Sequence, residues 1–230
     1  MKKIFLLLLL PLFAIKIYAQ ELQLHYDFLK DRQYLTGTFE IFKPDKLGST
    51  FMFTDINFDR HNGGASLAYF EIARKFNIPN NAIEGLNAHI EYNDGFLMTN
   101  TAVPAAFPIN YSVLGGMGFP VKMGNFTLNT SYLYKYIQGS NGIDGQFTAV
   151  WFHNFANNKF TLRGFLDVWS QPKLWSDKNK KMAVLLTEPQ FLYNITPHFS
   201  VGSEVEISKN FVVGTDDVKI FPTVMVKWGW

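Results

Sequence analysis

The sequence contains no cysteine, and after residue 13 it has no apolar run that approaches the roughly 20 residues of a membrane-spanning helix. The lack of cysteine excludes disulfides and thiolate metal sites, so packing and hydrogen bonds alone must stabilise the fold. A positive surplus is also missing. Without Lys2, Lys3 and Lys16, 18 basic residues face 19 acidic ones, and the net charge falls from +2 to about −1. A chain without a cationic patch is not expected to bind a nucleic acid polymer.

The first 19 residues have the layout of a secretory signal. Lys2 and Lys3 precede a short apolar stretch over residues 4–13, which Pro11 interrupts, and Ala19 precedes Gln20. This layout favours a cleaved signal over a membrane anchor. We therefore predict that residues 1–19 are removed and that residues 20–230 form a single exported domain.

The chain is rich in aromatic residues, with 23 Phe, 10 Tyr and 5 Trp, and apolar and polar residues alternate along most of it. Alternation with period two is typical of β-strands that have one apolar and one polar face. The longest uncharged stretch, residues 95–121, contains three prolines and cannot form a membrane helix. The alternation predicts twelve strands, near residues 22–28, 34–42, 49–58, 65–74, 86–93, 109–119, 126–136, 146–153, 160–169, 182–192, 198–208 and 218–230.

The connections between these strands alternate in length. Every second one is a compact turn: KPDKLG, NIPNN, KMGN, NFANN and NITP. Several of the others are longer: NDGFLMTNTAVPAAFP, QGSNGID, SQPKLWSDKNK and KNFVVGTDD. Short turns on one rim and long loops on the other are typical of outer-membrane barrels, which have an even strand count. We predict an all-β fold, a transmembrane antiparallel β-barrel of about 12 strands in the outer membrane of a Gram-negative bacterium, in contact with its lipid. A soluble periplasmic β-sandwich is the alternative fold.

Residues 161–169, TLRGFLDVW, indicate which face of a strand meets lipid. Leu162, Leu166 and Val168 lie on one face, and the polar and bulky aromatic side chains lie on the other. In water the second face would expose two rings beside two charges. In a bilayer the polarity is reversed, so the leucine face meets lipid and the other face lines a lumen.

The same alternation predicts a lumen of carboxylates and aromatic rings. The carboxylates outnumber the cations Arg163, Lys135 and Lys219, so the predicted lumen is acidic on balance. We therefore expect it to repel phosphates and to admit neutral or cationic solutes. A ring beside a carboxylate suits a nucleoside, whose base stacks while its ribose hydroxyls donate hydrogen bonds. The candidate solute-binding residues are Phe51, Phe53, Asp55, Tyr69, Glu71, His89, Glu91, Arg163, Phe165, Asp167, Trp169, Glu188 and Glu204.

Several motifs resemble a known family. GSTFMFTDINFD, LAYFEIAR, TEPQ, GSEVEIS and the terminal KWGW are similar, in this order, to the Tsx-like nucleoside-specific channel family and to a related family of uncharacterised outer-membrane proteins. The resemblance implies a twelve-stranded barrel that passively admits small solutes, most of all nucleosides. Trp230 resembles the terminal aromatic residue by which the barrel assembly machinery recognises such chains. No nucleoside-contacting residue of the family is matched by position.

A closed barrel is the alternative function. Inward charges, for example Arg163 with Asp167, could pair and plug the lumen, leaving a structural or adhesive protein whose long loops bind a partner. An enzyme is not expected: His61 with Asp59 and His198 with Ser200 are the candidate pairs, and neither forms a recognisable motif.

We predict no cofactor and no metal site. His25 and His89 are interpreted as polar lining of the lumen, because they lack the spacing of metal ligands. Gly115, Gly116 and Gly118 fit no phosphate-binding loop, because no helix follows them, and they are interpreted as sites of close strand approach.

Two irregularities are expected in the wall. Pro189 and Pro222 fall inside predicted strands and are interpreted as bulges or strand ends. The eighth strand is ambiguous, because two sets of apolar residues compete for its lipid face: Phe147, Ala149 and Trp151 against Val150 and Phe152.

Overall fold

The fold is taken from a computed structural model that describes residues 20–30, 32–59, 64–79, 82–99, 105–173, 177–212 and 215–230. The predicted signal, residues 1–19, lies outside the described residues, as does His61. Among the residues described, no helix is long and apolar enough to cross a membrane.

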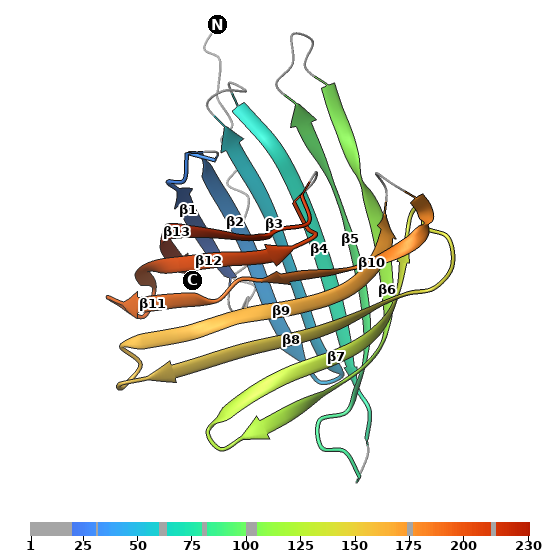
Figure 1. Cartoon of the computed structure of the whole chain (residues 1–230). Coiled ribbons are helices and arrows are strands. Elements are labelled where there is room, and N and C mark those ends of the chain that lie inside the picture. Colours follow the sequence, from blue (N-terminus) through green and yellow to red (C-terminus); the bar gives the residue numbers. More distant parts are fainter. Residues whose placement is uncertain are drawn as a thin grey trace, which may run out of the picture.

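The described residues form thirteen antiparallel strand segments and no helix (Figure 1). In chain order these are β1 (Gln20–Asp27), β2 (Leu35–Asp45), β3 (Gly48–Asp59), β4 (Gly64–Asn77), β5 (Asn87–Thr99), β6 (Ala105–Met123), β7 (Phe126–Ile137), β8 (Asp144–Phe155), β9 (Phe160–Lys173), β10 (Asp177–Thr187), β11 (Gln190–Asn194), β12 (Phe199–Lys209) and β13 (Val218–Gly229).

The sheet closes into a barrel of twelve wall strands. Each strand pairs with its neighbours along the chain, and β1 pairs with β13 from Glu21↔Gly229 to Asp27↔Thr223. The segments β10 and β11 together form one wall strand between β9 and β12. Closure gives the backbone a partner on both sides along most of the wall, which is the condition for crossing a bilayer with strands. The predicted transmembrane antiparallel barrel of 12 strands is confirmed.

The two ends of the barrel differ in their connections, in part as the sequence predicts. The backbones of Gln20 and Trp230 exchange two hydrogen bonds, of 3.3 and 3.0 Å, so the end of β1 and the end of the chain lie together. Four connections at the same end are turns of two to four residues, and the fifth, between Asn77 and Asn87, is longer than predicted; we call this end the terminal rim. The connections at the opposite end, the loop rim, include residues 138–143, 210–212 and 215–217.

Two of the predicted long loops are instead mainly strand. β5 continues to Thr99 and β6 begins at Ala105, so most of the first predicted loop forms a hairpin that rises above its neighbours (Figure 1). Its far edge is free, because the pairing of β6 with β7 begins only at Ser112. In the same way β9 continues to Lys173 and pairs with β10. The prolines and small residues of these two segments predicted loops. Pairing of β5 with β6, and of β9 with β10, extends the strands beyond their predicted ends.

The outer surface is apolar. On β13, Val218, Ile220, Val224, Val226 and Trp228 point outward and are 40–57% exposed. Aromatic rings form two bands on this surface. Near the terminal rim, the ring centre of Phe160 lies 5.5–5.6 Å from those of Phe155, Phe191 and Tyr193. Nearer the loop rim, the rings of Tyr92, Tyr111 and Tyr136 form a row. Two such bands are typical of both interfaces of a bilayer.

The ambiguous eighth strand has regular parity. Phe147 pairs with outward-facing Val168, and Thr148 pairs with inward-facing Asp167. Phe152 pairs with Arg163 and therefore faces the lumen, since directly opposite residues share a face of the sheet. Its side chain is 57% exposed. The lumen is therefore open to water next to the terminal rim.

Pro189 ends a strand segment, and this prediction is confirmed. The ladder stops at Thr187 and resumes at Gln190 with unchanged register toward β9 and β12. Gly164 lies against the gap with φ +152°, and a Cβ there would lie 2.6 Å from Glu188 O and 2.9 Å from Pro189 Cα. A glycine is required at this close approach.

The prediction for Pro222 is wrong, because it lies inside β13. Its partner Val205 donates its N–H away from β13, to Pro189 O at 3.1 Å. The pair Val205↔Pro222 is therefore one of the non-hydrogen-bonded pairs of an antiparallel ladder. The nitrogen of Pro222, which has no hydrogen to donate, faces β1. The pairing of β13 with β1 ends at Asp27↔Thr223, so no hydrogen bond of that ladder is lost at Pro222.

The neighbouring glycines of β6 give a test of close strand packing. A Cβ at Gly116 would lie 2.1 Å from Tyr132 O, whereas a Cβ at Gly115, on the lipid face, has nothing within 4 Å. We expect Gly116→Ala to destabilise the barrel by about 1–3 kcal/mol, the usual result of overpacking, and Gly115→Ala to leave it almost unchanged. Urea unfolding of both variants in detergent, followed by the heat-dependent gel shift, measures the difference. Equal stabilities would contradict the close packing of β6 on β7.

Candidate solute pathway through the lumen

Two packed groups of polar side chains occupy opposite sides of the lumen. We call them the arginine cluster, beside β1, β2 and β11–β13, and the lysine cluster, beside β5–β9. Both come from the polar face of the alternating strands, which the closed wall turns inward.

Arg163 is the centre of the arginine cluster. Its guanidinium donates to Glu21 of β1 and, through Nε, to Gln190 Oε1 at 2.6 Å, and it lies 3.8 Å from Glu40 of β2. Glu21 also receives Lys227 Nζ at 3.2 Å. Three wall strands lie between that of Arg163 and that of Glu21, so these contacts connect distant parts of the wall.

Glutamine and histidine side chains extend this cluster. Gln190 Nε2 donates to Glu204 Oε2 at 2.6 Å and to Gln23 Oε1 at 3.1 Å, and Gln23 contacts His25 Nε2 at 3.1 Å. Gln23 and His25 are only 1% and 4% exposed. This side of the lumen is filled.

The lysine cluster fills the other side. Lys135 Nζ donates to Gln146 Oε1 at 2.7 Å and lies 4.6 Å from the ring centre of Trp169. His89 Nδ1 lies 2.9 Å from Ser131 Oγ, and His89 Nε2 lies 3.3 Å from Glu91 Oε2. Lys135, His89 and Glu91 are all buried.

Between the clusters, side chains at mid-height of the wall remain partly exposed to water. They come from β3 and β4 on one side and from β9, the β10–β11 junction and β12 on the other, and these walls stand across the ring from each other. We call the region between these two sets of side chains the slot. It is bordered by Phe51, Phe53, Asp55, Tyr69 and Glu71, and across from them by Phe165, Asp167, Glu188 and Glu204.

The slot is acidic. Asp55 is close enough to Glu188 and Glu204 for their charges to interact, and Glu71 has the same relation to Asp167. Hydrogen bonds hold these groups: Thr38 donates to Asp55 and Thr148 donates to Asp167, each at 2.5 Å, and Tyr69 donates to Glu71 at 3.3 Å. Carboxylates that face each other in a confined space favour cations over anions.

Aromatic rings share one wall of the slot. The ring centre of Phe53 lies 5.8 Å from that of Phe51 and 5.7 Å from that of Tyr69. Phe165 lies opposite, on β9. Trp169 lies nearer the loop rim, where its ring meets Phe211 of the loop after β12 edge-on at 5.9 Å.

The thirteen candidate residues all face the lumen, and the structure divides them between these three places. His89 and Glu91 belong to the lysine cluster, and Arg163 belongs to the arginine cluster. Lys219 lies at the loop rim, 3.9 Å from Asp217. The predicted pair of Arg163 with Asp167 is wrong, since each has other partners. Glu21, Glu40 and Lys227, together with Gln23 and Gln190, were missed, although all five lie on polar faces of their strands.

His198 and Ser200, one of the two pairs considered for catalysis, have other partners. His198 Nδ1 lies 2.9 Å from Gly229 O, and Ser200 Oγ donates to Asn194 Oδ1 at 2.8 Å. Within the described ranges no three His, Asp or Glu side chains are grouped to hold a metal ion.

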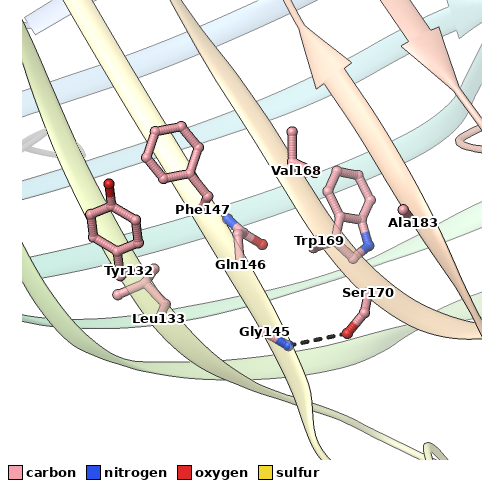
Figure 2. Close-up of a pocket in the computed structure, with 9 residues that line it drawn as sticks. All are labelled: Tyr132, Leu133, Gly145, Gln146, Phe147, Val168, Trp169, Ser170 and Ala183. Atoms are coloured by element: carbon pink, nitrogen blue, oxygen red, sulfur yellow. Dashed lines mark hydrogen bonds between the residues drawn. The ribbon is translucent and has the colours of Figure 1, made fainter.

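A shallow hollow of about 600 Å³ lies in the wall outside the slot (Figure 2). Its outward-facing residues include Tyr132, Phe147 and Val168, which are neighbours across β7, β8 and β9. Gly145 donates its N–H to Ser170 Oγ at 3.2 Å beside them. These outward-facing residues place the hollow on the lipid side of the wall.

Comparison with known proteins identifies the family. The profile of the family described as "Domain of unknown function (DUF5020)" matches residues 19–230. The chain belongs to this family. No curated protein matches the chain. The resemblance to the Tsx-like family is not confirmed by these matches.

Solved structures show the fold. The NanC porin structure covers 91% of this chain and 98% of its own length, at 10% identity and a TM-score of 0.55. A KdgM porin structure covers 93% and 99% at 10% identity and a TM-score of 0.48, and the outer membrane protein Omp33 of Acinetobacter baumannii gives a TM-score of 0.43 at 10% identity. The likeness to the NanC porin shows that the DUF5020 chain has the barrel fold of that structure.

The arginine cluster gives a stability test. Arg163→Met would leave Glu21 and Glu40 facing each other without their shared cation, and we expect a loss of about 3–5 kcal/mol. Arg74→Met is the matched control, because Arg74 pairs with the exposed Asp45 at 2.5 Å outside the lumen and should cost no more than about 1 kcal/mol. The urea concentrations at the midpoint of unfolding in detergent measure the loss of stability in both variants. A loss no larger for Arg163 than for Arg74 would contradict the central role of the cluster.

Proposed function

We propose that this protein is an outer-membrane channel for the passive uptake of small solutes, with nucleosides as the favoured class. The observation that carries the proposal is the slot: side chains at mid-height of the wall remain accessible to water between two packed clusters. A barrel that served only as a scaffold would have no need of water-accessible side chains at its centre.

The orientation follows from the rims. The short turns and the joined chain ends of the terminal rim suit the periplasmic side, and the loop rim then faces the cell exterior. The apolar exterior and its two aromatic bands suit the lipid of the outer membrane. A cleaved signal would deliver the chain, and the barrel assembly machinery would recognise the terminal Trp230.

The chemistry of the slot suits a nucleoside. The rings of Phe53 and Tyr69, with Phe165 opposite, offer faces on which a base can stack. Asp55 and Glu71 lie in register with these rings and can accept hydrogen bonds from ribose hydroxyls. The carboxylates disfavour nucleotides, because any ionised carboxylate in this confined space repels a phosphate.

A closed barrel remains the second candidate, because much of the lumen is packed. The side chains of Ser131, Leu114 and Leu192 are at most 1% exposed although they face inward. On this reading the protein would serve as a structural or adhesive barrel, and the projecting β5–β6 hairpin would be the natural partner-binding surface. Conductance separates the two functions, because only a channel passes ions and solutes.

Liposome swelling tests the proposal directly. We expect liposomes that contain the refolded protein to swell faster in adenosine or thymidine than in uncharged sugars of similar mass, because stacking in the slot favours the bases. Equal rates would show a general small pore. No swelling with a folded, heat-modifiable preparation would overturn the channel and favour the closed barrel.

Stacking has its own test. Phe53→Ala and Phe165→Ala should each weaken nucleoside block of the channel current by about 1–3 kcal/mol, or roughly 5–150-fold in affinity, because each removes a stacking face. Phe191→Ala is the control, since Phe191 is 50% exposed on the lipid face. Unchanged affinity in both lumen variants would remove the stacking hypothesis and leave the channel itself intact.

A further inference from the structure

The loop between β1 and β2 places a cation at the outer end of the acidic slot. Arg32 lies in this loop, and its guanidinium donates two hydrogen bonds to Glu206, from Nη1 at 2.7 Å and from Nη2 at 3.2 Å. Its Nη1 also lies 3.6 Å from Asp27 Oδ2. Glu206 and Asp27 both face the lumen from the loop-rim halves of β12 and β1.

An aromatic ring completes the seat of this guanidinium. Its central carbon lies 3.4 Å from the ring centre of Phe221 on β13, which is a close cation–π contact. Two hydrogen bonds to one carboxylate, together with contact with a ring face, fit a planar guanidinium better than a compact ammonium. The side chain of Arg32 is only 20% exposed, so it lies within the mouth of the barrel and not above it.

The site continues directly into the slot. Glu188 of the slot is close enough to Glu206 and to Arg32 for their charges to interact. Burial disfavours the charge of Arg32, but the hydrogen bonds to Glu206 and the nearby charges of Glu206, Tyr34 and Asp27 together outweigh this effect, and the pKa of Arg32 lies above its ordinary value. The loop therefore supplies a permanent positive charge where a solute would enter.

Backbone hydrogen bonds hold the loop in this position. Leu29 O accepts the N–H groups of Arg32 and Gln33, at 2.9 and 3.1 Å, and Asp27 N donates to Tyr34 O at 3.1 Å. Asp27 Oδ1 caps the turn by accepting the N–H of Leu29 at 2.9 Å. These hydrogen bonds hold the turn from which the side chain of Arg32 extends.

We propose that the outer end of the slot is a guanidinium-binding site and that Arg32 occupies it as a tethered guest. This inference rests on the proposed channel function and deepens it. While Arg32 is seated, it narrows the entrance and offsets part of the acidic charge. Without it, the entrance presents Asp27, Glu188, Glu204 and Glu206 to the solution and accepts a small organic cation with a guanidinium group in the same seat.

Planar-bilayer recording with a potassium chloride gradient tests the site. We expect Arg32→Ala to raise the single-channel conductance at low salt by roughly twofold or more and to shift the reversal potential toward that of potassium, because one positive charge leaves the entrance. Millimolar guanidinium chloride should return the current of this variant toward the wild-type value. Urea, a neutral molecule of the same shape, should not.

Two further variants make the result specific. Arg74→Ala is the control, because Arg74 also forms a forked pair, with Asp45, and lies 4.9 Å from the ring of Phe76, but it is on the outer face. It should leave conductance and selectivity unchanged. Arg32→Gln keeps length and polarity, so agreement between Arg32→Gln and Arg32→Ala shows that the lost charge, and not a folding defect, changes the current.

The outcomes separate the two proposals. If the wild type conducts and both Arg32 variants match it, or if guanidinium and urea act alike on Arg32→Ala, the tethered-guest site is overturned while the channel stands. If neither the wild type nor any folded variant conducts, the channel and the site that depends on it are both overturned.

Discussion

The structure depends on closure of the backbone ladder, because a strand that crosses lipid has no water to satisfy its N–H and C=O groups. Pairing of β1 with β13 supplies this closure. Once the ring is closed, the polar faces of all strands point to one another, and side chains far apart in the sequence meet. Arg163 meets Glu21 in this way, although 142 residues separate them.

The same closure explains how the lumen is organised. A ring of twelve strands is wider than the small barrels that their own side chains fill, and narrower than the open barrels of general porins. Here long polar side chains fill two opposite sides of the lumen and leave its centre to shorter carboxylates and to aromatic rings. The packed clusters therefore act as lateral supports for the slot, and loss of a support should change the shape of the pathway as well as the stability of the wall.

The strands could be predicted from the sequence because period-two alternation is a local property, and each predicted segment overlaps an observed strand. Parity was predicted for the same reason, except in the eighth strand, where two apolar sets competed and only the pairing with β9 places Phe152 in the lumen. Contacts across the lumen were not predictable. Arg163 and Asp167 are neighbours on one face, but four residues of a strand span about 13 Å, and partners from other strands come closer. Loop lengths were misjudged at residues 93–108, where proline-rich composition outweighed the pairing between β5 and β6.

The projecting hairpin has a consequence for how copies of this protein avoid one another. Beyond the wall, Ala105–Asn110 of β6 have no partner on the β7 side, which leaves a free edge of about 20 Å. An exposed strand edge is a template onto which a strand of another chain can add. Pro108 lies within this edge and cannot donate a backbone hydrogen bond. Pro108, which contributed to the prediction of a loop here, thus interrupts the free edge and opposes strand-by-strand association of protein copies in a crowded membrane.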